Sequence, residues 1–351
     1  TATGWNNHIM KELKYYLGLD PAAMWTYDAV YDPTSARAPE FGGVQEVFYS
    51  RAQFAAREHE NMIKVRTWLN HMWKYQAKDT GEYTFLPDKE ICFVDRLRHR
   101  MPGYSKQTGM KHHVDNGCLS RWADPAWQRI YSKIFEGKLD GYDPWDATHR
   151  TECAGGGFRS YQGWLALTPQ GPNDGSLEVV PMLRETTMYI LLRPLLADVP
   201  AHLFPGARDV AGDSVEVTSR WHSPLLRGVT SIGHVDPGDT VWWHPDLIHA
   251  VSSEHTGTQP ANVIYVPASP MCPCNASYVA RQRESFLKGE APPDYPFGRS
   301  LALEVDSPYR ARPSDLGKLG KQMMGIEPYT ASDEDDEGSA AFLRECNAIL
   351  F

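Results

Sequence analysis

The chain has 351 residues and carries 35 Lys and Arg against 44 Asp and Glu, a formal net charge of −9. Hydrophobic residues make up 42% and charged residues 23%, a globular composition that excludes wholesale disorder. No run of about 18 apolar residues occurs, so we expect no membrane span. The polar first ten residues show no signal peptide. An acidic chain lacks the basic cluster that a phosphate backbone requires, which argues against nucleic acid as the main partner.

The six cysteines are too sparse for a disulfide scaffold in a chain of this length. None forms the C-x-x-C pair of a zinc site, and Cys272-Pro-Cys274 is the nearest approach. Reduced thiols are typical of an intracellular protein, and we therefore expect a cytoplasmic location. The cysteines are Cys92, Cys118, Cys153, Cys272, Cys274 and Cys346.

The first 80 residues are predicted to form an N-terminal helical region. A short helix is expected over residues 8–17. Ser50 and Gln53 then have the spacing of a capping box, in which two side chains satisfy backbone N–H groups at a helix start. Apolar residues at helical spacing follow this cap, so we expect one helix from residue 50 to residue 75.

From residue 83 onward, short runs of β-branched and aromatic residues alternate with Gly, Pro, Asn and Asp. This texture is typical of an all-β sandwich or barrel. One helix is expected to interrupt it, because Asp124 can cap a helix that has Pro125 in its first position and ends at Gly137. The expected strands lie in YTFL, EICFVDRLRH, FRSYQGWLALT, GSLEVVP, TTMYILL, SVEVTS, GVTSI, DTVWW, LIHAVSS and NVIYVPA.

The β texture stops after Pro270. Helices are expected over residues 276–288 and 340–350, and the Pro- and Arg-rich segment 290–313 could cover a barrel edge or a neighbouring subunit. The acidic run 332–339 (SDEDDEGS) is expected to be a loop. We therefore expect one globular unit, mainly β with helical decoration. Its parts are a helical region at 1–80, a β domain at 81–270 and a helical or irregular extension at 271–351.

A His-x-Asp pair is the sequence signature of one kind of iron site. Two neutral imidazoles and one carboxylate bind the metal there and leave positions open for other ligands. In an extended segment, residues i and i+2 point to the same side, so this spacing can present both ligands together. Thirteen histidines make chance matches expected. The pairs that fit are His113-Val114-Asp115, His234-Val235-Asp236 and His244-Pro245-Asp246.

The order of the motifs favours the first pair, which alone has several expected strands between it and a later histidine. Downstream come QGWLALTP, GSLEVVP and PGDTVWWH, and His249 lies five residues beyond. This order resembles the phytanoyl-CoA-hydroxylase-like branch of the Fe(II)/2-oxoglutarate dioxygenases. The phrases DRLRHRMPG, FRSYQGWLAL and NVIYVPASPMC are similar, more narrowly, to a bacterial and fungal family of unknown function within that superfamily.

The resemblance implies that the β domain is a double-stranded β-helix, the jelly roll or cupin-like fold. Its second strand would deliver His113 and Asp115 and its seventh strand His249, and these three are the implied metal ligands and catalytic residues. The other two His-x-Asp pairs are then expected to be surface or turn residues, and His112 is expected to point away from the metal. Related halogenases have Gly or Ala in place of the aspartate, so Asp115 favours hydroxylation or another ordinary oxidation.

One element that the resemblance implies is missing. In that branch an Arg shortly after the distal histidine pairs with the far carboxylate of 2-oxoglutarate, but residues 250–270 contain neither Arg nor Lys. A buried carboxylate requires a cationic partner. In the implied fold the last strand lies between the first and the third, so we expect the cation from one of these, Arg159 first and Arg98 second. Trp164 matches an aromatic that lines the co-substrate pocket, although it could also be a core residue.

The implied function is oxidation of a C–H bond, most simply hydroxylation, in a small-molecule substrate. Fe(II), 2-oxoglutarate and O2 would be required, and succinate and CO2 would be released. The missing arginine leaves open a cupin-like metalloenzyme that does not use 2-oxoglutarate, and a non-catalytic metal-binding barrel is a third interpretation. The sequence names no substrate and leaves the oligomeric state open, a homo-oligomer included.

Overall fold

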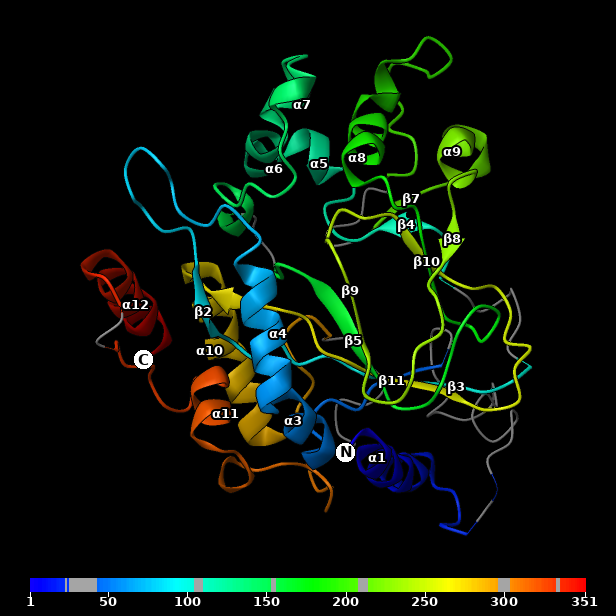
Figure 1. The fold of residues 1–351 in the computed structure, drawn as a ribbon, viewed down its shortest axis with the longest axis vertical. Helices are drawn as coiled ribbons and strands as arrows, with labels where there is room; N and C mark the ends of the chain where they lie inside the picture. The colour runs from blue at the N-terminus through cyan, green and yellow to red at the C-terminus, as the bar shows by residue number, and fades with distance from the viewer. Residues whose placement is uncertain are drawn as a thin grey trace.

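The structure, a computed structural model, describes residues 1–22, 24, 43–103, 110–152, 156–207, 214–295, 304–332 and 335–351. Helices and antiparallel sheets share these residues, so the protein is more helical than the expected mainly β fold (Figure 1). Cys153, and Asp333 and Glu334 of the acidic run, lie outside the described residues. In the described ranges, no helix combines the length and the apolar character needed to cross a membrane.

Two five-stranded antiparallel sheets form the centre of the molecule. The strand order is β1–β3–β11–β5–β9 in the first sheet and β7–β4–β10–β6–β8 in the second, and β2 and β12 pair separately. The first sheet contains β1 (Val44–Gln45), β3 (Leu97–Arg100), β5 (Gln162–Ala166), β9 (Thr240–Trp243) and β11 (Ala261–Tyr265). The second contains β4 (His113–Val114), β6 (Leu177–Val179), β7 (Val215–Glu216), β8 (Thr230–Ser231) and β10 (His249–Val251). The remaining strands are β2 (Leu86–Glu90) and β12 (Pro270–Met271).

The two sheets share an apolar cluster between them, because successive side chains of a strand point to opposite faces. Val263 of β11 pairs with Ala166 of β5, and both pack with Leu177 of the second sheet. The neighbouring pair, Ile264 and Leu165, points the other way and packs against α1 and α3. The first sheet is thus buried on both faces. Alternate side chains of β3, β5 and β11 point into the space between the two sheets.

Helices cover the outer faces of both sheets (Figure 1). α8 and α9 pack on the second sheet, and α10 and α12 form the largest core cluster together with residues around β2. The N-terminal helices are α1 (Ala2–Leu17), α3 (Arg51–Arg57) and α4 (Glu60–Asn70). The middle ones are α5 (Ser120–Ala123), α6 (Pro125–Ile130), α7 (Ser132–Phe135), α8 (Leu183–Leu192) and α9 (Ser219–Leu226). The last three are α10 (Pro273–Lys288), α11 (Lys318–Met323) and α12 (Glu337–Leu350).

The predicted helix caps at Ser50 and Asp124 are confirmed, but the helices that follow them are shorter than predicted, and the helices predicted from residues 8, 276 and 340 start earlier, at Ala2, Pro273 and Glu337. Ser50 and Gln53 form the capping box of α3, and the Gln53 side chain accepts a hydrogen bond from the Ser50 N–H at 3.1 Å. The prediction of a single helix over 50–75 is wrong, because α3 ends at Arg57 and His59 caps a second helix, α4. Asp124 caps α6 as predicted, yet that helix ends at Ile130 and α7 follows it.

The strand predicted in TTMYILL is wrong, because this segment forms most of α8. Its β-branched residues favour a strand locally. Thr186, Thr187, Ile190 and Leu191 nevertheless lie buried at helical spacing, and both threonine hydroxyls donate to the Leu183 carbonyl. Packing of this helical face therefore overrides the local preference.

The acidic run 332–339 is only partly a loop. Its last residues, 337–339, form the first turn of α12, and the Asp336 side chain accepts a hydrogen bond from the Ser339 N–H at 2.7 Å. An aspartate in this position satisfies one of the unpaired N–H groups of a helix start. Part of the negative charge that predicted a loop thus stabilises a helix terminus instead.

Candidate metal centre

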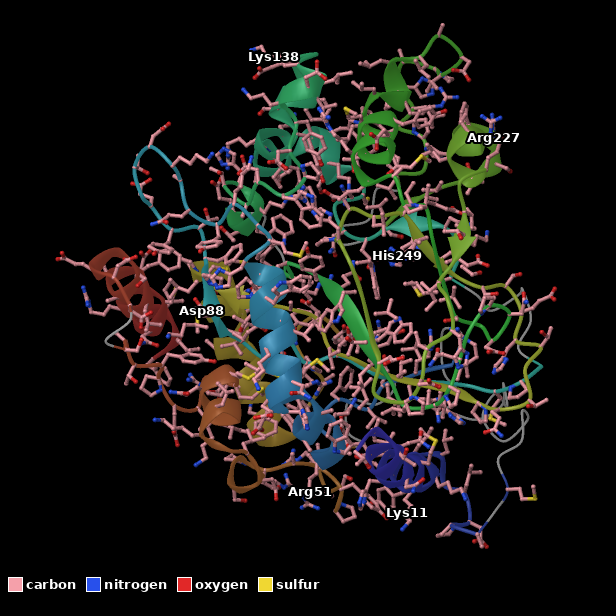
Figure 2. The ribbon with its side chains drawn as sticks, viewed as in Figure 1. Lys11, Arg51, Asp88, Lys138, Arg227 and His249 are labelled. Carbon is pink, nitrogen blue, oxygen red and sulfur yellow. The ribbon has the colours of Figure 1, made fainter. Side chains whose placement is uncertain are left out.

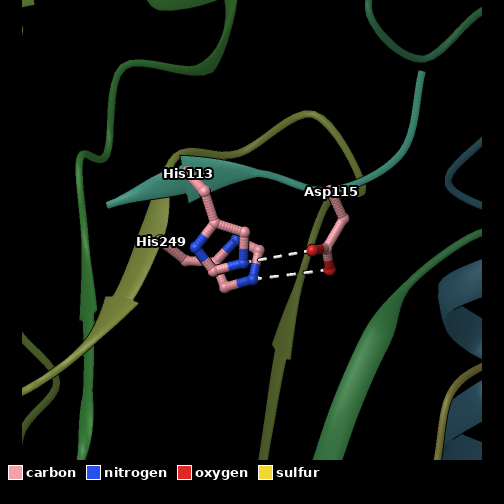
Figure 3. A group of neighbouring side chains, drawn as sticks. All are labelled: His113, Asp115 and His249. Atoms are coloured by element: carbon pink, nitrogen blue, oxygen red, sulfur yellow. Dashed lines mark ion pairs between the residues drawn. The ribbon is translucent and has the colours of Figure 1, made fainter. Parts of the chain in front are cut away.

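Two neighbouring strands bring the predicted ligands together at the edge of the inner space. His113 of β4 lies directly opposite His249 of β10 in the antiparallel pair, and Asp115 follows two residues after His113. Figure 3 shows the three side chains converging on one point. His249 is buried, whereas the charged side chains of Lys138 and Arg227 lie at the periphery of the molecule (Figure 2). The i, i+2 spacing therefore acts as predicted.

The donor atoms of this cluster lie close enough to share one ion. Asp115 Oδ1 is 3.1 Å from His113 Nε2, and Asp115 Oδ2 is 3.5 Å from His249 Nε2 (Figure 3). One ligand atom from each residue falls within 4.8 Å of the other two. Among the described residues, this is the only group of three or more His, Cys, Asp or Glu side chains with such spacing.

Backbone carbonyls orient both imidazoles. Nδ1 of His113 lies 2.6 Å from the carbonyl oxygen of Lys111, and Nδ1 of His249 lies 3.0 Å from that of Leu247. A neutral ring that donates from Nδ1 carries its lone pair on Nε2, the atom that faces Asp115. This is the outer-shell arrangement that fixes tautomer and ring direction in metal-binding histidines.

The aspartate of the cluster is held in its ionised form. Burial by itself raises the pKa of the Asp115 carboxyl, but His249 and His113, when protonated on Nε2 in the absence of a metal, outweigh it and hold that pKa well below its usual range. Two imidazoles and one carboxylate are the donor set that non-haem Fe(II) takes, with other coordination positions left open. The residues present therefore fit such a metal.

The other two His-x-Asp pairs differ in their burial. His234 and Asp236 are exposed, 3.3 Å apart, as expected for turn residues. His244 and Asp246 do lie in a turn, closed by the Leu247 N–H donating to the His244 carbonyl at 2.9 Å, but both are buried and not at the surface. The His244 ring stacks on Trp73 with centroids 4.9 Å apart, and burial lowers its pKa to about 3. His244 is therefore neutral, and its ring is part of the buried packing around Trp73.

A charged aspartate can occupy the buried position of Asp246 because two guanidinium groups meet it. Arg150 lies 2.7 Å from one carboxylate oxygen and Arg121 lies 2.9 Å from the other. Burial by itself raises the pKa of Asp246, but Arg150 and Arg121 outweigh it and hold that pKa well below its usual range. Sequence reasoning missed both arginines, since they are distant in the chain and belong to no motif.

His112 stays outside the cluster, as expected. Its side chain is half-buried, and its Nε2 lies 3.7 Å from a carboxylate oxygen of Glu178 on β6. Burial, and then the charges of His113 and His249, lower the pKa of His112. A neighbouring residue of an extended segment points to the opposite side, which accounts for the exclusion.

Arg98 and Trp164, two of the predicted co-substrate residues, lie together between the sheets. Arg98 pairs with Val263 across β3 and β11, and the same face carries Ala166. Its guanidinium lies 5.6 Å from the centroid of the Trp164 ring and donates to Gln170 Oε1 at 2.6 Å. Both Arg98 and Trp164 are 1% exposed. This places a buried cation and an aromatic side by side on the inner face.

Arg159, the third predicted co-substrate residue, takes a different position. It precedes β5, is half-buried and packs over the Phe93 ring with 5.0 Å to the centroid. Burial by itself lowers the pKa of Arg159, but acidic neighbours, with Asp115 first, raise it above its ordinary value. Arg159 thus lies within electrostatic reach of the metal-ligand cluster.

Two buried indole groups offer donors in the space between the sheets. Nε1 of Trp164 and Nε1 of Trp243 are buried and have no hydrogen-bond partner in the described ranges. The Trp243 ring lies 5.3 Å from the His249 ring, centroid to centroid. Buried polar groups are nearly always paired, and an unpaired one carries a desolvation cost. The pattern fits a polar ligand next to the three-residue cluster.

The chain belongs to the Gig2-like family, whose model matches residues 4–326. It is 35% identical over 337 residues to the uncharacterized protein YbiU of Escherichia coli K12, and the aligned region covers 93% of this chain and 76% of YbiU. A crystal structure from Salmonella typhimurium LT2, whose name proposes an oxidoreductase, is 35% identical with a TM-score of 0.79 over 93% of this chain and 77% of that one. The structure of GlcNAc Inducible Gene 2 from Candida albicans is 28% identical, with a TM-score of 0.77 over 88% and 72%. These relatives come from bacteria and a fungus, as the sequence resemblance to a bacterial and fungal family implies.

Proposed function

We propose that this protein is a non-haem Fe(II)/2-oxoglutarate-dependent dioxygenase that hydroxylates a C–H bond of a small-molecule substrate in the cytoplasm. One observation carries the proposal, the convergence of His113, Asp115 and His249 with Nδ1 of both histidines directed at backbone carbonyls. A metal with two imidazoles and one carboxylate keeps the open positions that a co-substrate and O2 require. The name of the Salmonella relative supports an oxidoreductase.

The sheet topology supports a double-stranded β-helix as the core. If β3 is its first strand, then β4, β5 and β6 are the second, third and fourth, and β8 to β11 are the fifth to the eighth. β7, at the edge of the second sheet, is an additional strand outside this count. The metal-ligand histidines then come from the second and seventh strands, as the sequence resemblance implies. The eighth strand, β11, lies between the first and the third, β3 and β5. We infer that the two sheets are the two walls of a jelly roll.

Arg98 is our candidate for the residue that pairs with the far carboxylate of 2-oxoglutarate. The last strand provides no cation in residues 250–270, but Arg98 stands beside that strand, directly opposite Val263 on the inner face. A guanidinium matches a carboxylate with two parallel hydrogen bonds. Trp164, in contact with Arg98, adds an indole N–H that lacks a partner in the described residues.

The protein's own groups would hold, orient and shield the reactants. His113, Asp115 and His249 would bind Fe(II), which together with 2-oxoglutarate supplies O2-dependent oxidation with release of succinate and CO2. The backbone carbonyls of Lys111 and Leu247 keep Nε2 of each imidazole directed at the metal position. Apolar side chains between the sheets exclude water, which strengthens every charge interaction inside.

An anaerobic titration tests the proposal. Metal-free protein receives Fe(II) and then 2-oxoglutarate while the visible spectrum is recorded, and we expect the weak charge-transfer band of the chelate. His113→Ala should abolish the band. Protein that binds Fe(II) but shows no band would instead support a cupin-like metalloenzyme with another co-substrate, the alternative favoured by the missing arginine. Protein that binds no metal would leave a non-catalytic barrel.

A further inference from the structure

A buried ion cluster adjoins the metal-ligand residues without belonging to them. Its centre is Asp246, which is 2% exposed. One carboxylate oxygen accepts hydrogen bonds from Arg121 Nη1 and from the Tyr131 hydroxyl, each at 2.9 Å, and the other accepts from Arg150 Nη1 at 2.7 Å. Buried pairs of this kind often add little net stability, because desolvation offsets the attraction. The cluster therefore calls for a role beyond stability.

Arg121 extends from this cluster to the segment that carries the metal-ligand aspartate. Its Nη2 donates to the backbone carbonyl of Asp115 at 2.8 Å, and its Nε donates to the carbonyl of Asn116 at 3.1 Å. One planar guanidinium thus donates to two consecutive carbonyls and to the Asp246 carboxylate at once. Arginine offers five donors in a rigid fork, and no other side chain can make this set of bonds.

The backbone after Asp115 turns sharply to present these carbonyls. Asn116 and Gly117 both have left-handed conformations, with φ of 60° and 76°. A Cβ on Gly117 would lie 2.8 Å from the Trp127 ring and 2.9 Å from Cγ of Arg121. Only glycine fits without moving the arginine. The Asn116–Gly117 turn and the Arg121 side chain therefore pack directly against each other.

The opposite end of the cluster fixes the segment that leads into β10. Asp246 lies three residues before His249, and its N–H donates to Nδ1 of His244 at 3.0 Å. Nε2 of His244 in turn donates to the carbonyl of Pro144 at 3.0 Å. These hydrogen bonds fix the backbone at Asp246, three residues before His249, and Arg121 is bonded to the Asp246 carboxylate.

We propose that Arg121, bonded to Asp246, is a positioning residue that sets the distance between the Asp115 segment and the His249 segment and so preorganises the metal site. The proposal deepens the proposed function, because it assigns a task to the second buried His-x-Asp pair. Two ligands on separate segments bind one ion more tightly when their spacing is fixed before binding. The Arg121 fork provides a direct cross-link between the two.

Co(II) binding to the full-length protein tests the cross-link without reference to turnover. Arg121→Lys keeps the charge but cannot bond both carbonyls and Asp246, so we expect the Kd for Co(II) to rise about 10- to 100-fold and the visible Co(II) spectrum to change. Arg66→Lys is the matched control, because Arg66 forms a buried pair with Glu90 at 3.2 Å between α4 and β2. That variant should lose stability and keep the parental Kd and spectrum.

The outcomes separate positioning from stability and from the choice of co-substrate. Folded Arg121→Lys with the parental Kd and spectrum would overturn the proposal, as would equal weakening by Arg66→Lys. If Arg121→Lys does not fold, Gly117→Ala replaces it, since the new Cβ displaces the Arg121 side chain, and the same two results decide. Parent protein that binds Co(II) but forms no 2-oxoglutarate band would overturn the dioxygenase alone. Parent protein that binds no Co(II) would overturn both.

Discussion

His113 and His249 face each other across the β4–β10 strand pair, with ring centroids 4.3 Å apart and ring planes inclined by 50°. The two residues are far apart in sequence, and only strand pairing makes them neighbours. Directly opposed residues of an antiparallel pair present their side chains to the same face. Asp115, two residues after His113 and just beyond the end of β4, completes the set.

Loss of one histidine should impair metal binding, whereas loss of a histidine from an exposed His-x-Asp pair should not. We expect His249→Ala to weaken Fe(II) or Co(II) binding by roughly 100-fold or more, because a first ligand contributes more than the outer-shell groups whose loss costs 10- to 100-fold. Isothermal titration with Co(II) measures this change. His234→Ala is the control, since His234 is exposed and its ion pair is with Asp236, outside the three-residue cluster. Equal affinities for the two variants would contradict the site.

Arg98 and Arg159 should differ in their effect on 2-oxoglutarate. We expect Arg98→Gln to raise the Kd for 2-oxoglutarate by about 10-fold or more, because a charge-assisted pair to a buried carboxylate is lost. Arg159→Gln should have a smaller effect, since Arg159 lies ahead of β5 over Phe93. Titration of the charge-transfer band gives both constants. The opposite ranking would assign the far carboxylate to Arg159, the first expectation from sequence.

Stability should fall as the pH rises from mildly acidic to basic, in part because of Glu12. Burial raises the pKa of this carboxyl to about 8 from an ordinary value of 4.5, although the Tyr16 hydroxyl donates to it at 3.3 Å. The folded state holds the proton more tightly than the unfolded state. The resulting stabilisation is complete below pH 4.5 and is lost as the pH rises through about 8.

Glu12→Gln should remove this dependence. We expect the variant to be more stable than the parent at pH 8. Between pH 4.5 and about 8, the free energy of unfolding of the parent should fall by up to about 1.4 kcal/mol per pH unit because of Glu12, and this contribution should be absent from the variant. Urea unfolding at several pH values measures the slope. Glu304, whose pKa burial raises to about 7, should leave a residual decline in the variant. Exposed Glu60→Gln is the control, and a Glu12→Gln slope equal to that control's would refute the assignment.

Gly163 of β5 should not tolerate a side chain. A Cβ at this position would lie 2.3 Å from Cε3 of Trp242 on the neighbouring strand β9. A rigid ring on a paired strand cannot yield without moving backbone, so Gly163→Ala should lower the free energy of unfolding by about 1–3 kcal/mol. Gly233→Ala is the control, because nothing lies within 4 Å of its added Cβ. Denaturant unfolding compares the two, and similar stabilities would show that the sheet can yield.

Local signals predict the two helix caps correctly and the types of the elements less reliably. The Ser50 capping box and the Asp124-Pro125 start depend on contacts within one turn, so they are readable from a few residues. The sequence predicts a strand where α8 forms, because Thr186, Thr187 and their apolar neighbours suit either structure. Only the partner surface decides which periodicity is used.

By itself, the sequence determined the three ligand candidates and the i, i+2 spacing that lets His113 and Asp115 share a side. It predicted a surface or turn position for His244 and Asp246, but not that this turn is buried and that two arginines bind Asp246 there. The reason is physical: side-chain direction follows from local backbone geometry, whereas burial and charge neutralisation depend on groups far away in the chain. The tertiary structure alone brought Arg98 beside Trp164 and joined Arg121 to both ligand segments.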